Sequence, residues 1–194
     1  MLKQLRTVFM VFLLLTTVSG IVYPLLVTGV AHLVFPEKAN GSLIFKEDGY
    51  FGSSLIGQPF DDPKYFWGRP SATSDFPYSP ASSSGSNLGP SNPTLAEAVK
   101  ARANALQKAD PGNKSSIPID LVTSSGSGLD PHMSPAAARY QTPRVARARG
   151  MAEDQVRRLV EQFTDPRQLG FLGEPRVNVL RLNLALDGLS SHRK

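Results

Sequence analysis

The feature that most constrains this chain is an uncharged, apolar stretch near its N-terminus. Residues 7–31 contain no Asp, Glu, Lys or Arg. A helix needs about 20 apolar residues to cross a bilayer core, so the stretch is long enough with room for tilt. A cleavable signal peptide is the alternative, because Thr17 and Ser19 resemble a cleavage site, but its apolar region spans only about 7–15 residues. The apolar run continues to Phe35, so we expect a retained membrane helix over 7–35.

The basic residues beside this stretch predict its orientation. Lys3 and Arg6 precede the span, whereas Glu37 and Lys38 follow it without a positive excess. By the positive-inside rule, the segment with more Lys and Arg stays in the cytoplasm. We therefore predict a cytoplasmic N-terminus over residues 1–6 and an extracytoplasmic domain over the remainder, 36–194.

Composition limits the chemistry open to this domain. The 194 residues include no cysteine, which excludes disulfides, thiolate metal sites and thiol catalysis. Only three histidines are present, so a histidine-built metal site is not expected. The net charge of +5 comes without a block of Lys and Arg, and does not indicate nucleic-acid binding. The 41% hydrophobic content is enough for one packed core.

Turn signals and apolar periodicity predict a mixed domain after the span. Asn-Pro, Ser-Pro and Thr-Pro pairs mark helix starts, and Asp-Gly marks a tight hairpin. We therefore predict an α+β fold class: one N-terminal transmembrane helix and a single small α+β domain. The predicted elements are a hairpin over 42–51 extended by Leu55 and Ile56, a loop over 70–93, a helix from Asn92 to Pro111, a strand over 117–123, a helix from Ser134 that breaks at Pro143 and restarts up to Gly150, an amphipathic helix over 156–163, and a strand entering a helix over 177–186.

A serine hydrolase is the sharpest enzymatic interpretation of the sequence. Asp130 and His132 lie close to Ser127, and an acid, a base and a hydroxyl are the parts of a catalytic triad. However, the chain has no Gly-x-Ser-x-Gly nucleophile elbow, and an Asp-Pro-His turn can be purely structural. We assign no catalytic residue, and keep a membrane-anchored external hydrolase using Ser127 and His132 as the alternative.

An aromatic cluster offers a second candidate site. Tyr65, Phe66 and Trp67 precede Arg69, and Trp67 is the only tryptophan. Trp, Tyr and Arg dominate the residues that carry binding energy at protein interfaces. The same aromatic side chains would also suit the core of a small domain. The sequence leaves both a partner-facing role and a core role open.

Several segments resemble the C subunit of bacterial Kdp potassium-transporting ATPases. They occur in order along nearly the whole chain, and the match is densest over 120–132 (DLVTSSGSGLDPH). The others are 23–29, 40–44, 52–58, 65–71, 84–90, 134–136, 145–150 and 173–179.

This resemblance implies a non-catalytic, single-pass subunit of the bacterial inner membrane. Its implied partners are a channel-like A subunit that carries K⁺, a P-type B subunit that hydrolyses ATP, and a small F subunit. It further implies a role in assembly, and a chaperone-like increase in the affinity of the B subunit for ATP. Because ATP is cytoplasmic and the domain is predicted outside, we expect ATP on the partner subunit and no cofactor on this chain.

The loop 70–93 and the turn 124–130 are the segments predicted to face the A subunit or the K⁺ entrance. Both are rich in Ser and Gly, which present backbone groups without bulk, and function concentrates on such loops. A free-standing anchored binding module is a further alternative. The residues predicted to face a partner are Tyr65, Phe66, Trp67, Arg69, Asn87, Ser127, Asp130 and His132.

Overall fold

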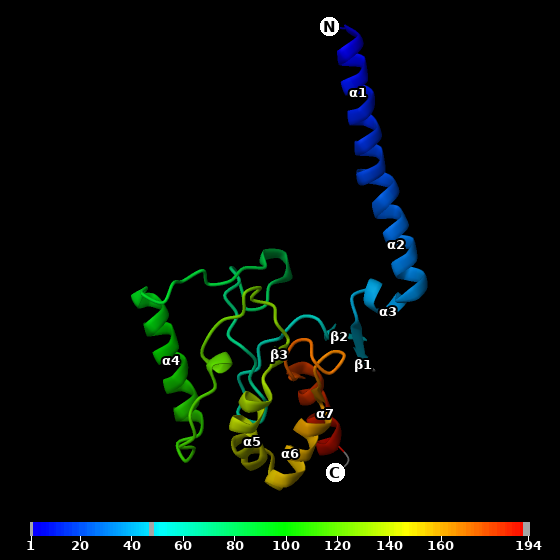
Figure 1. Ribbon diagram of the computed structural model, residues 1–194. Coiled ribbons are helices and arrows are strands. Elements are labelled where there is room, and N and C mark those ends of the chain that lie inside the picture. The colour runs from blue at the N-terminus through cyan, green and yellow to red at the C-terminus, as the bar shows by residue number, and fades with distance from the viewer. Residues whose placement is uncertain (1, 47–48, 192–194) are drawn as a thin grey trace. The chain divides into compact units, whose positions relative to one another are not determined.

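The computed structural model describes residues 2–46 and 49–191. The chain divides into two compact units, with unit 1 ending at Ser53 and unit 2 starting at Ser54. Figure 1 shows the helices and strands of both units in chain order. The predicted limit between anchor and outer domain, at residue 35, concerns the membrane and stays a prediction.

Unit 1 begins with one long helix, made of α1 (Leu2–Thr17), a π-helical turn (Val18–Val22) and α2 (Tyr23–Val34). Among the described residues, Leu2–Val34 is the one helix long and apolar enough to cross a membrane, with a mean hydropathy of 2.2 over its best window. Its side chains are exposed in the isolated chain. The predicted apolar helix is therefore present, and starts at Leu2.

The π-helical turn lies just before a proline. The N–H of Tyr23 donates to the carbonyl of Val18, and the next residue, Pro24, has no N–H to donate. The hydroxyls of Thr17 and Ser19 donate to the carbonyls of Leu13 and Leu15, at 2.8 and 2.6 Å. Polar groups in lipid must be satisfied within the protein, and these side-chain bonds meet that requirement inside the helix.

The short helix α3 (Pro36–Ala39) leads to the predicted hairpin, which is confirmed as β1 (Leu43–Lys46) and β2 (Gly49–Ser53). Asp48 of the predicted turn lies outside the described residues. The predicted extension of the second strand through Leu55 and Ile56 is wrong. The buried Ser54 explains why, because its carbonyl accepts a hydrogen bond from Asn178 within unit 2.

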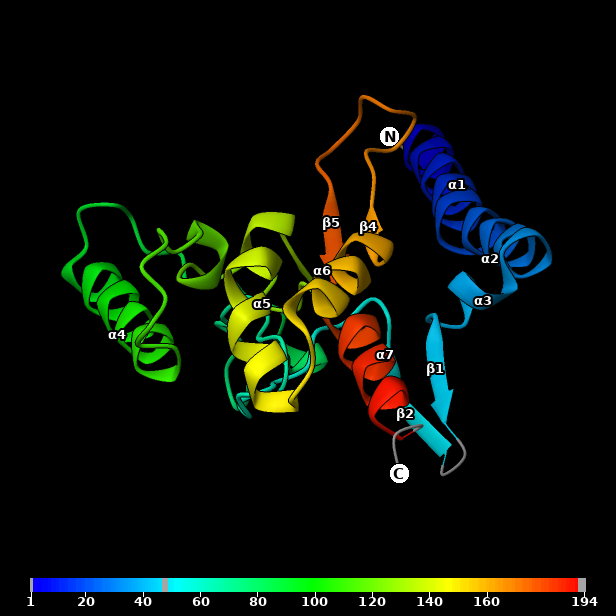
Figure 2. The same ribbon diagram turned by 90° about the horizontal axis from the view of Figure 1, so that it is seen from below.

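Unit 2 combines four helices with a small antiparallel sheet of order β3-β5-β4. The strands are only two or three residues long. Figure 2 shows α5, α6 and α7 close to β4 and β5. The elements are α4 (Pro93–Ala109), β3 (His132–Met133), α5 (Pro135–Arg149), α6 (Glu153–Gln162), β4 (Thr164–Asp165), β5 (Arg176–Asn178) and α7 (Val179–Ser191).

The core of unit 2 forms where the apolar faces of its helices meet the sheet. Val145 of α5, Val156 of α6, Val177 of β5 and Leu182 and Leu186 of α7 are fully buried in one cluster. The predicted amphipathic helix and the predicted strand entering a helix are both confirmed. The α+β fold class is therefore confirmed.

Two predicted helix boundaries follow the expected capping chemistry. The Asn92 side chain accepts from the N–H of Thr94 at the start of α4. Gly150 ends α5 with a left-handed φ of +61°, a conformation that glycine adopts without steric cost. The loop 70–93 is confirmed, apart from a 3₁₀ turn at Pro80–Ser82.

Two predictions for unit 2 are wrong. Residues 117–123 form a 3₁₀ turn at Ile119–Leu121 and no strand, because the Asp120 carboxylate accepts from the backbone N–H and hydroxyl of Ser134. Helix α5 continues through Pro143 without a break. A proline inside a helix costs about 3 kcal/mol, and burial of most of α5 against the core offsets that cost.

Candidate functional site

Two buried amide side chains hold the aromatic segment in place. Asn183 of α7 accepts from the N–H of Phe66 and donates to its carbonyl, both at 2.9 Å. Gln141 of α5 does the same for Trp67, at 2.9 and 3.0 Å. These paired bonds replace the neighbouring strand that an extended segment would normally need. The two amides therefore fix the register of the segment against the core.

The aromatic side chains have different surroundings. Phe66 has no exposed surface and belongs to the core, so the partner-facing prediction is wrong for this residue and the core role is correct. Trp67 is half-buried, and the Arg144 guanidinium lies 4.3 Å from its ring centroid. Burial lowers the pKa of Arg144 to about 10. The half-buried Tyr65 donates to the Asp187 carboxylate at 3.0 Å.

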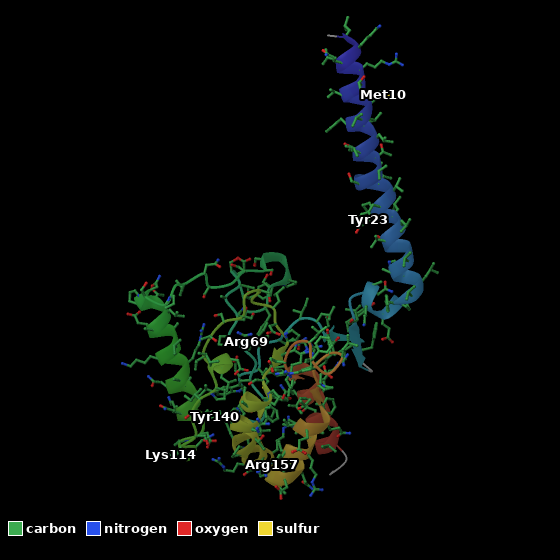
Figure 3. All side chains as sticks on the ribbon, viewed as in Figure 1. Met10, Tyr23, Arg69, Lys114, Tyr140 and Arg157 are labelled. Carbon is green, nitrogen blue, oxygen red and sulfur yellow. The ribbon has the colours of Figure 1, made fainter. Side chains whose placement is uncertain are left out.

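Arg69, Asp130 and His132 form one polar cluster at the surface of unit 2. Arg69 pairs with the Asp130 carboxylate at 3.2 Å, and the His132 ring nitrogen lies 3.3 Å from the same carboxylate. Burial would raise the pKa of Asp130, but the hydrogen bonds and charge of His132, together with Arg69, outweigh it and hold that pKa below its ordinary value. Arg69 is labelled in Figure 3. The structure thus brings three of the predicted residues together.

Ser127 does not complete a catalytic triad with this pair. Its hydroxyl accepts from the N–H of Leu129 at 3.1 Å, as in a local turn. Within the described part of the chain, His132 makes its side-chain contact with Asp130 and none with the Ser127 hydroxyl. The Asp130 carboxylate is also committed to Arg69. The arrangement lacks the base-to-nucleophile contact that a serine hydrolase needs.

Hydrogen bonds join the loop 70–93 to the turn 124–130. Ser71 donates from its hydroxyl to the carbonyl of Gly128 at 2.7 Å. The Ser84 N–H and the Ser83 hydroxyl both donate to the carbonyl of Ser127 at 3.0 Å. Residues 71–87 and 124–130, named the Ser/Gly face below, therefore form one surface.

Glycine is required where the two segments of the Ser/Gly face meet. A Cβ on Gly128 would lie 2.6 Å from the carbonyl oxygen of Ser84, and its φ is +68°. A Cβ on Gly85 would lie 2.9 Å from the carbonyl oxygen of Gly126. Asn87, predicted to face a partner, is exposed on this face with a φ of +53°.

Several residues that build this region were not expected from the sequence. Tyr78 is buried, donates to the carbonyl of Arg69, and burial raises its pKa to about 12. Gln141 and Asn183 lie 74 and 117 residues from the backbone they bind. No local motif encodes such pairings. Within the described ranges, no three His, Asp or Glu side chains gather into a group that could hold a metal ion.

Comparison with known proteins gives a consistent family. The model of "K+-transporting ATPase, c chain" matches residues 5–188. The potassium-transporting ATPase KdpC subunit of Sorangium cellulosum is 61% identical over 188 residues, covering 97% of this chain and 99% of the relative. That of Methylococcus capsulatus is 57% identical over 189 residues, covering 97% and 100%. The resemblance inferred from the sequence is confirmed, and the chain belongs to the KdpC family, the C chain of K⁺-transporting ATPases.

Proposed function

We propose that this subunit is non-catalytic, and that its outer domain stabilises the assembled potassium pump by docking on a larger subunit. The Ser/Gly face is the observation that carries the proposal. Two segments separated by about 40 residues of sequence meet there through backbone and hydroxyl hydrogen bonds. Binding and catalytic residues concentrate on loops that a rigid scaffold positions.

The geometry of the Ser/Gly face suits a docking surface better than a reaction site. Ser127 and Asn87 are exposed, while the backbone below them is held by bonds such as Gly57 N–H to the Leu129 carbonyl at 2.8 Å. Because the loops are already ordered, a partner would not have to supply the entropy cost of ordering them. Binding of the native domain then stabilises the complex by linkage.

The partner that we infer for this face is the channel-like A subunit or the K⁺ entrance. The positive charges of Lys3 and Arg6 before the apolar helix support a cytoplasmic N-terminus and an outer domain. ATP would then bind the P-type B subunit on the other side of the membrane. Any rise in ATP affinity would reach the B subunit through coupling across the assembly, with no nucleotide contact by this chain.

An exposed charge on the Ser/Gly face tests the docking proposal. Ser127→Arg in the full-length chain, expressed with the other subunits, should reduce co-purification of the larger subunits about tenfold, which corresponds to 1.4 kcal/mol. Gln107→Arg on α4 is the matched control, because Gln107 is also exposed and lies outside the face. Equal recovery for the two variants would contradict the proposal. Recovery of the wild-type chain from membranes without larger subunits would favour a free-standing module.

The orientation needs a separate test. A tag fused after the C-terminal residue should be cleaved by protease added to intact spheroplasts, whereas a tag before Lys3 should be protected. Protection of the C-terminal tag would place the domain in the cytoplasm and overturn the proposed topology.

A further inference from the structure

The loop between β4 and β5 exposes three large apolar side chains. Leu169, Phe171 and Leu172 are 83%, 69% and 48% exposed, and are named the apolar tip below. Figure 2 shows this loop projecting beyond the ends of β4 and β5, away from α5, α6 and α7. Single exposed apolar residues are normal on a protein surface, but a group at the end of a projecting loop marks a site of interaction.

The backbone of the apolar tip is already satisfied by its own hydrogen bonds. Gln168 and Leu172 exchange two N–H to carbonyl bonds of 2.9 Å. The N–H groups of Gly170 and Phe171 donate to the carbonyls of Arg167 and Gln168, at 3.2 and 3.3 Å. Burying an unpaired polar group is costly, and these four donors would enter an apolar environment already paired.

The conformation of the apolar tip is also defined by its left-handed residues. Leu169 has a φ of +53°, Gly170 +82° and Gly173 +73°. A left-handed conformation is unfavourable for a leucine, so the surrounding hydrogen bonds must hold Leu169 in place. Its side chain is thereby presented to the exterior in a fixed direction. A preordered loop binds at a lower entropy cost than a flexible one.

The charges at the base of the loop are paired with one another. Arg167 donates to both oxygens of Glu174, at 2.8 and 2.7 Å, and Arg176 lies 3.9 Å from Asp165. An anionic lipid surface attracts unpaired cations, and this base presents pairs of zero net charge. An apolar centre with a polar rim is the arrangement of a protein interface. The charge pattern therefore favours an uncharged protein surface over a lipid headgroup region.

We propose that the apolar tip inserts into an uncharged, apolar cleft on a larger subunit of the same potassium pump. This inference rests on the proposed docking function and adds a second contact, separate from the Ser/Gly face. The tip supplies the apolar area of the contact, and the paired charges of Arg167, Glu174, Arg176 and Asp165 surround it.

The absence of cysteine from the natural chain allows a direct test. Phe171→Cys and the control Gln107→Cys are each made in the full-length chain and treated with a maleimide reagent in broken membranes, where both faces are accessible. Labelling of this chain is compared with and without co-expressed larger subunits. We expect labelling of the Phe171→Cys variant to slow about tenfold only when the larger subunits are present, as for a contact worth 1.4 kcal/mol, and labelling of the control to be unaffected.

Each other outcome has a defined meaning. Rapid labelling at position 171 in a complex that still co-purifies overturns the apolar-tip proposal and leaves the proposed docking function intact. Slow labelling without the larger subunits shows that lipid or the chain itself covers the tip, and also overturns the proposal. If Phe171→Cys keeps normal Trp67 fluorescence but loses the larger subunits, while Phe171→Leu retains them, the proposal is supported.

Discussion

Replacing Asn183 by leucine removes the side chain that pairs with both backbone groups of Phe66. Leucine has a similar size, so the change leaves the Phe66 N–H and carbonyl buried without their 2.9 Å partners. Each unsatisfied buried group costs about 1–3 kcal/mol. The leucine side chain returns about 1–2 kcal/mol through apolar burial. We therefore expect a net loss of about 3 kcal/mol in the free energy of unfolding.

The single tryptophan makes this loss measurable at the site itself. Trp67 follows Phe66 directly, and no other tryptophan contributes to the emission. Urea unfolding of the full chain in mild detergent, followed by Trp67 fluorescence, should show a midpoint about 2 M lower for Asn183→Leu, given a slope of about 1.5 kcal/mol per M.

The matched control is Gln107→Leu, which makes a similar change at an exposed position of α4. Its free energy of unfolding should stay within about 0.5 kcal/mol of the wild type. If Asn183→Leu shifts the midpoint no more than this control, the Asn183 amide does not hold the aromatic segment in place, and the proposed role of the amide in fixing Phe66 is refuted.

Three further variants test the surroundings of the site. Gly128→Ala should cost about 2 kcal/mol in a urea melt, because φ is +68° and the new Cβ meets a backbone oxygen; Gly126→Ala, with open space around it, should cost little, and equal losses would refute this. The folded-state pKa of Tyr78, about 12, exceeds the ordinary value of 10, so its stabilising effect is complete below pH 10 and lost as pH rises to 12. The stability gap between wild type and Tyr78→Phe should narrow by up to about 3 kcal/mol over that range, and a constant gap would contradict it. The pKa of Asp130 lies below its ordinary value of 3.8, so its contribution is present above that pH and lost on further acidification; Asp130→Asn should show a flatter decline in melting temperature below pH 4, and parallel declines would count against the ion pairs.

The elements that the sequence predicts correctly are those encoded locally. The apolar helix, the Asn92 cap and the Gly150 helix end each depend on residues within a few positions of one another. The union of the loop 70–93 with the turn 124–130 could be suspected from composition only, since both are rich in Ser and Gly.

The elements that the sequence does not predict depend on distant partners. Asp120 binds Ser134 and so forms a turn where β-branched residues suggested a strand. Phe66 is buried because an amide 117 residues away pairs with its backbone. Pro143 stays in an unbroken helix because neighbouring side chains are buried on the core side. In each case a tertiary contact outweighs a local preference.

The short strands of unit 2 explain why its polar side chains matter for function. Strands of two or three residues cannot fix long segments such as 54–92 by a sheet ladder. Amide, hydroxyl and carboxylate side chains therefore take over the pairing of backbone groups, as Asn183 and Ser71 do. Loops held in this way are ordered before any partner arrives, and the free energy of docking is not spent on ordering them. It follows that Gly128→Ala should weaken pump assembly more than removal of one exposed hydroxyl, such as Ser127→Ala, because the glycine holds the two segments of the face together and the hydroxyl supplies only one contact.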